Sequence, residues 1–90
     1  MYFKDGKFVK DAPAKINGDF NISDTDIDSL VGAPKEVTGD FNCNNTNITS
    51  LEGAPRIVGG NFSCSFTNIT SFKGAPTKVG KEFICFVDNT

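Results

Sequence analysis

Three cysteines are the residues of this sequence best suited to chemistry at a metal or redox centre. They are Cys43, Cys64 and Cys85, one every twenty-one residues. That spacing fits no CxxC zinc pattern, and three thiols cannot all pair within one chain. Ile22 lies one interval before Cys43, so the position calls for an apolar side chain of modest size. We therefore interpret the cysteines as buried core residues, whose free thiols suit a reducing cytosol.

The carboxylates offer no stronger candidate for catalysis or for calcium binding. Asp24, Asp26 and Asp28 alternate as in a calcium loop, but the glycine and the later glutamate of such a loop do not follow. Histidine, the commonest general acid–base and metal ligand, is absent from the sequence. No Gly-rich phosphate loop is present either. We expect neither an enzyme nor a cofactor or metal site, and we interpret these aspartates as a solvated acidic edge.

The composition limits the kinds of partner. The chain has 90 residues, enough for one small domain, and its 9 basic and 11 acidic residues give a net charge of −2. A basic nucleic-acid-binding surface is therefore not expected. No apolar run approaches the ~20 residues of a membrane span, and no charged-then-apolar leader is recognisable. We expect a cytoplasmic protein that binds neither nucleic acid nor a membrane.

A repeat of twenty-one residues organises almost the whole chain. It is visible in four prolines, Pro13, Pro34, Pro55 and Pro76, each preceded by alanine. No insertion breaks the spacing over three periods, which indicates a repeat architecture. We divide the chain into a hairpin cap, three full repeats and a partial repeat, at residues 1–11, 12–32, 33–53, 54–74 and 75–90.

The spacing inside one unit is that of a leucine-rich repeat. The segment Phe41-x-Cys43-x-x-Thr46-x-Ile48 matches LxLxxNxL, with threonine where asparagine is usual. The units resemble the short leucine-rich-like repeats in small proteins of bacteriophages and bacteria, over about residues 9–90. The resemblance implies a parallel repeat fold and an accessory role. The pattern is specific for a fold, whereas many unrelated functions use it.

Alternating apolar and polar residues predict one strand in each repeat. Phe41 and Cys43 alternate with polar neighbours, a period of two that indicates a strand with one buried face. Equivalent strands would stack in parallel at ~4.8 Å. We expect the Thr46 hydroxyl to hydrogen-bond the following turn, Pro55 to fix a far corner and Gly59–Gly60 to allow the last bend.

The predicted fold is all-β: a short right-handed parallel β-solenoid of leucine-rich-repeat type, with about four rungs. Stacking of the repeats would bury their apolar columns. One such column comprises Val9, Leu30, Leu51 and Phe72. No segment has a helical period, so we expect the side opposite the strands to be extended or 3₁₀. Asp5-Gly6, between short apolar runs, predicts an N-terminal β-hairpin cap.

The residues that occupy equivalent outward positions on the predicted strands change from polar to apolar along the repeats. In the first two rungs they are polar and acidic, and include Asp19, Asp24 and Asp40. In the last two rungs, apolar residues stand where the repeat elsewhere has serine, asparagine or aspartate; these are Phe66, Ile84, Phe86 and Val87. Exposed apolar clusters with aromatic anchors are typical of interaction sites. The alternative is that Phe86 and Val87 fold over the last rung as a cap. The column that ends at Phe86 is expected to face solvent throughout, and runs Ser23, Asn44, Ser65 and Phe86.

Two hypotheses about function follow. In the first, the chain is a non-enzymatic protein-binding module, anchored by the four apolar residues and steered toward a basic partner by the three aspartates. The resemblance implies, as one version, a phage accessory protein that inhibits a bacterial host defence or regulatory protein by occlusion. In the second, the chain is a structural or self-assembling repeat segment of a larger phage or bacterial protein, with a homodimer through its C-terminal rung.

Overall fold

The computed structural model describes residues 3–4, 7–8 and 14–86, and each of its strands is two residues long. The strands are β1 (Phe3–Lys4), β2 (Lys7–Phe8), β3 (Lys15–Ile16), β4 (Phe20–Asn21), β5 (Glu36–Val37), β6 (Phe41–Asn42), β7 (Ile57–Val58), β8 (Phe62–Ser63), β9 (Lys78–Val79) and β10 (Phe83–Ile84). β1 and β2 pair antiparallel, as the predicted hairpin requires, while Asp5-Gly6 and Val9 lie outside the described residues. The described residues form no helix, and thus none long and apolar enough to cross a membrane.

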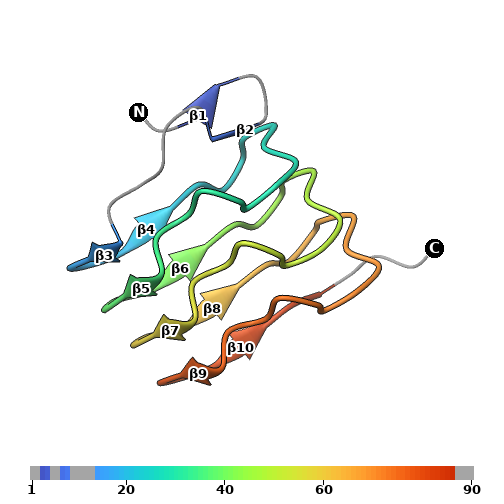
Figure 1. Cartoon of the computed structure of the whole chain (residues 1–90). Helices are drawn as coiled ribbons and strands as arrows, with labels where there is room; N and C mark the ends of the chain where they lie inside the picture. Colours follow the sequence, from blue (N-terminus) through green and yellow to red (C-terminus); the bar gives the residue numbers. More distant parts are fainter. Residues whose placement is uncertain (1–2, 5–6, 9–13, 87–90) are drawn as a thin grey trace.

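The other eight strands form two parallel sheets that run side by side along the repeats (Figure 1). One sheet has the order β4-β6-β8-β10 and the other has the order β3-β5-β7-β9. In both, each residue pairs with the residue twenty-one positions later, as Phe20 does with Phe41 and Ile16 with Val37. This register confirms the twenty-one-residue repeat and the all-β parallel solenoid.

The sheet β3-β5-β7-β9 was not predicted as a sheet. The backbone there is extended, as expected, and no 3₁₀ turn occurs in the part of the chain that the structure describes. Val37 and Val58 are buried, while the preceding Glu36 and Ile57 lie toward the outside. A strand of two residues is too short to reveal a period of two in the sequence.

A ladder of phenylalanines forms the centre of the core. Phe20, Phe41, Phe62 and Phe83 stack on one another, with ring centroids 5.7, 5.2 and 5.1 Å apart in that order. Phe41 and Phe62 are fully buried. Each such pair contributes ~0.5–1.5 kcal/mol beyond the area it buries. The remaining core columns, which include Val58 and Ile48, pack around this ladder.

The core column of Leu30 and Leu51 was predicted wrongly at Phe72. Leu30 and Leu51 are fully buried, but 55% of Phe72 is exposed. Its ring packs edge-on against Phe83, with 6.1 Å between centroids, and 42% of Phe83 is itself exposed. Both residues belong to the end of the stack, where β10 has a neighbouring strand on one side only. The stacking of neighbouring rungs buries the side chains of a column, and Phe72 lacks that cover on one side among the described residues.

Threonine hydroxyls close the turns after β4, β6 and β8, as the sequence predicted. Thr46 Oγ1 donates to the Cys43 carbonyl oxygen at 2.9 Å. Thr25 and Thr67 make the equivalent bond in their own repeats, at 2.8 and 3.1 Å. Thr46 and Thr67 are buried, so these bonds satisfy hydroxyls that would otherwise lose their contact with water.

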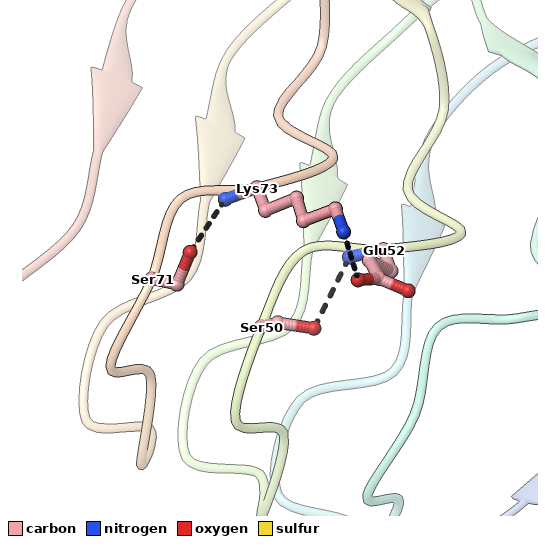
Figure 2. A network of polar contacts seen from close by, with 4 residues as sticks. All are labelled: Ser50, Glu52, Ser71 and Lys73. Atoms are coloured by element: carbon pink, nitrogen blue, oxygen red, sulfur yellow. Dashed lines mark hydrogen bonds and ion pairs between the residues drawn. The ribbon is translucent and has the colours of Figure 1, made fainter.

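A second set of hydroxyls stabilises the outer turns of the three full repeats, and Figure 2 shows those of Ser50 and Ser71. Ser50 Oγ accepts the Glu52 N–H, and Ser71 Oγ accepts the Lys73 N–H in the next repeat. Lys73 Nζ lies 3.5 Å from Glu52 Oε1, which joins the two turns. Both side chains are exposed, so this ion pair contributes at most ~1 kcal/mol.

Glycine is required at the corners for two different reasons. Gly53 at the far corner has φ 91°, and a Cβ there would also overlap the Leu30 carbonyl group. Gly59 and Gly60 lie in a bend, as the sequence predicted, although neither has φ in the left-handed region. Instead, a Cβ on Gly59 would overlap the Thr38 carbonyl oxygen of the preceding rung. Close stacking of the rungs therefore favours glycine at position 59 within this bend.

Candidate binding surface

Two residues with strongly exposed aromatic side chains lie on adjacent rungs. Phe66 is 66% exposed and Phe86 is 70% exposed. The Phe66 N–H donates to the Phe86 carbonyl oxygen at 2.8 Å, so their backbones are in direct contact. Ile84, two residues before Phe86, is half-buried in β10. We name Phe66, Ile84 and Phe86 the aromatic patch; Val87, the fourth apolar residue expected here, lies outside the described residues.

Phe66 adopts a backbone conformation that large side chains avoid. Its φ is 58°, and the equivalent residues Asp24 and Asn45 have φ values of 59° and 57°. Aspartate and asparagine tolerate the left-handed region, and here Asn45 Nδ2 donates to Asp24 Oδ1 at 2.8 Å. A phenylalanine ring makes no such bond, and the left-handed conformation costs it roughly 1–2 kcal/mol. Strain held at an exposed aromatic residue is a physical indication of function.

Asp19 and Asp40 hold neighbouring rungs together. Asp19 Oδ1 accepts the Asp40 N–H, and Asp40 Oδ1 accepts the Asn61 N–H, both at 2.8 Å. Asn61 Oδ1 continues the series by accepting the Glu82 N–H at 3.1 Å. This bonding role was not predicted from the sequence, although an oxygen at the same side-chain position in Asp19, Asp40 and Asn61 was a signal for it. Asp19 is exposed and Asp40 is half-buried, so their charge remains near the surface.

The column that ends at Phe86 does not face solvent throughout, which corrects the sequence prediction. Ser65 is only 4% exposed and Asn44 is half-buried. The Ser65 N–H donates to Asn44 Oδ1 at 2.7 Å, and the Phe86 N–H donates to Ser65 Oγ at 3.1 Å. These bonds between rungs draw the short side chains inward. Phe86 lies at the end of the series, and its ring stays exposed.

The surface beside Phe66 is hollowed. A depression of about 640 Å³, open to solvent, crosses three consecutive repeats. Its lining comprises Ser23, Asp24, Asn42, Asn44, Asn45 and Phe66. Phe66 is the aromatic member of this lining and Asp24 the charged one, so an apolar ring stands beside a mainly neutral polar surface.

The cysteines pack in the core: Cys43 and Cys64 are fully buried, and Cys85 is partly buried against them. Burial, with a smaller contribution from Cys85, raises the pKa of Cys43 to about 12. Burial first, and then the hydrogen bond and charge of Cys85, raise the pKa of Cys64 as well. Protonated thiols are poor nucleophiles and poor metal ligands. Among the described residues, no three His, Cys, Asp or Glu side chains are grouped to hold a metal ion.

Comparison with protein-family models, with curated proteins and with solved structures yields no match to this chain.

Proposed function

We propose that the chain is a non-enzymatic module that binds a protein partner through the aromatic patch. The observation that carries this proposal is Phe66, an exposed aromatic residue at a strained position where the other repeats have Asp24 and Asn45. Asparagine would relieve the strain and remove an apolar ring from water. Partner binding gives a reason to keep the ring, because aromatic side chains are typical anchors of protein interfaces. Phe86, in contact with Phe66 through the backbone, adds a second exposed ring.

The aspartates of the first two rungs support a partner with a basic rim. Asp19, Asp24 and Asp40 use Oδ1 within the solenoid, as acceptors for side-chain or backbone N–H groups. Their negative charge is still available to attract a basic surface. Charges at the rim of an interface act mainly on the association rate and on its salt dependence. Charge-neutralising variants should therefore slow association more than they speed dissociation.

The resemblance to phage and bacterial repeats supports a specific version of this function. In it, a small phage accessory protein binds a bacterial host protein in the cytoplasm and occludes the working surface of that defence or regulatory protein. The free cysteines of the core agree with a reducing compartment. The leucine-rich-like spacing of each repeat is the feature that links this chain to such proteins.

A pull-down from bacterial lysate tests the proposed surface. Tagged wild-type protein is compared with Phe66→Asn and Phe86→Ser, which install the residue types that the repeat uses elsewhere at these positions. Val31→Ser is the matched control, since Val31 is 64% exposed but lies outside the patch. We expect one stoichiometric partner, retained by the control and lost from both patch variants. A partner captured equally by the patch variants would contradict the proposed surface.

Self-assembly is a second candidate function, favoured by the end of the stack. Phe72 and Phe83 are 55% and 42% exposed there, and β10 has an unpaired edge among the described strands. A second copy, or further repeats of a larger protein, would bury both rings and extend the sheet. Light scattering over a range of concentrations tests this, with Phe72→Ser expected to weaken association. A monomer at every concentration would contradict self-assembly.

A further inference from the structure

The depression beside Phe66 presents hydrogen-bond donors to a ligand from two asparagines. Asn44 Oδ1 accepts the Ser63 hydroxyl at 2.7 Å and the Ser65 N–H at 2.7 Å. Asn42 Oδ1 accepts the Asn44 N–H at 2.9 Å. Because the bonds among the described residues use these carbonyl oxygens, each side chain offers its NH₂ group to a ligand.

The lining of the same depression also includes acceptors. Asn45 donates its Nδ2 to Asp24 Oδ1 at 2.8 Å, so its own Oδ1 faces no donor of the described residues. The second carboxylate oxygen of Asp24 is an acceptor of the same kind. The depression therefore combines NH₂ donors with carbonyl and carboxylate acceptors, next to the exposed ring of Phe66.

A sugar ring has the same mixed chemistry. Each hydroxyl both donates and accepts, so neighbouring hydroxyls can bridge an NH₂ group and a carboxylate oxygen. The C–H face of a pyranose is apolar and packs on an aromatic face. We propose that this depression binds one or two rings of a neutral saccharide, a role that shares the Phe66 ring with the protein contact but not Phe86.

The charge of the lining argues against other small ligands that could pack on the Phe66 ring. Asp24 lies in the depression, while Lys and Arg are absent from its lining. A phosphate or an acidic sugar would therefore be repelled. An arginine side chain would satisfy Asp24, but it would bring its N–H groups against the NH₂ groups of Asn42 and Asn44. A neutral ligand with hydroxyls leaves no such mismatch.

The bonds between rungs hold the lining in place before a ligand arrives. Binding therefore requires little ordering of side chains, which favours affinity. The depression is open, however, and a ligand would bury only part of its surface there. We expect dissociation constants on the order of 1 mM, the range in which weak single-site ligands fall.

Nitrogen-15 NMR of the full chain tests the proposal directly, because the NH₂ groups in question give their own signals. The neutral probes are cellobiose, maltose, lactose and N,N′-diacetylchitobiose. Glucuronic acid, a sugar phosphate and N-acetyl-arginine amide are the charged probes. We expect a neutral probe to shift the side-chain signals of Asn42, Asn44 and Asn45, with little change elsewhere.

Three variants assign the effect to the depression. Phe66→Asn should lower the association constant about tenfold, through loss of the ring. Asn42→Asp keeps the acceptor for the Asn44 N–H and removes the donor, so it should abolish binding while the protein stays folded. Phe86→Ser, outside the lining, should leave saccharide binding unchanged.

The proposal is overturned if no neutral probe shifts these signals, if a charged probe shifts them more, or if Asn42→Asp binds as the wild type does. Failure of the protein contact is distinguishable from failure of this site. A protein partner retained by Asn42→Asp but lost from Phe86→Ser would support the aromatic patch whatever the saccharide result.

Discussion

The strain at Phe66 predicts a specific order of stability among variants. Phe66→Asn and Phe66→Ala both remove the ring, so each loses the third of its surface that the fold covers. They differ in the backbone: alanine keeps the cost of ~1–2 kcal/mol of the left-handed region, whereas asparagine tolerates it. Asparagine can also extend the bond that Asn45 makes to Asp24, which would contribute ~0.5–1.5 kcal/mol. We expect the asparagine variant to exceed the alanine variant by about 2 kcal/mol in the free energy of unfolding.

Urea unfolding, followed by circular dichroism, measures this difference, and an unchanged m-value shows that the comparison is between like states. In thermal unfolding the same difference corresponds to about 8–16 °C for a domain of this size. Phe86→Asn and Phe86→Ala are the control pair, because Phe86 is equally exposed but its φ is not positive. That pair should differ by less than about 0.5 kcal/mol. Equal stability of the two Phe66 variants would refute the strain argument, and with it the main support for the proposed surface.

Three further predictions concern the solenoid itself. Gly53→Ala should lower the free energy of unfolding, measured by urea titration, by about 2–4 kcal/mol. The alanine would have to adopt a left-handed backbone, and its Cβ would overlap the preceding rung. A loss below ~1 kcal/mol would contradict this. Asp40→Ala should cost ~1 kcal/mol by the same assay, through loss of the bond to the Asn61 N–H, while Asp40→Asn, which keeps the acceptor, should cost little. Because the folded-state pKa values of Cys43 and Cys64 lie above their unfolded values, the stability that these thiols contribute is complete below about pH 9. It should fall by ~1.4 kcal/mol per pH unit for each thiol as the pH rises toward 12, and urea titrations of Cys43→Ala should show a smaller slope.

The sequence predicted what depends on the repeat alone. Equal spacing fixed the register, and the pairing of Phe20 with Phe41 follows from it. The alternation around Phe41 and Cys43 identified one parallel sheet, and the position of Thr46 identified the turn that it closes. These features repeat in every unit, so each copy supports the same interpretation. Long-range pairing is readable here because in a solenoid the partner always lies one period away.

The sequence could not show which side chains of a column are buried by the adjacent rungs and which stay exposed. Ser65 was read as outward because its residue type is polar, yet bonds to adjacent rungs bury it. Phe72 was read as inward because its column is apolar, yet the end of the stack leaves it exposed. In both cases, burial depends on contacts with the neighbouring repeats. The residue types within a single repeat do not show those contacts. The left-handed backbone of Phe66 was hidden for a similar reason, since nothing about phenylalanine predicts it.

A solenoid can keep a strained residue where a globular core could not. Each repeat contacts only its neighbours, so stability is close to a sum of local contributions. The strain of Phe66 therefore weakens one turn and leaves the phenylalanine ladder beneath it intact, with Phe62 still fully buried. A single outward residue can differ from the repeat pattern without disturbing the core. An inward residue cannot, because it packs against the adjacent rungs. The proposed function therefore predicts that the residues it needs lie where an outward column departs from its own pattern. In this chain the departure at Phe66 produces both the aromatic patch and the wall of the depression.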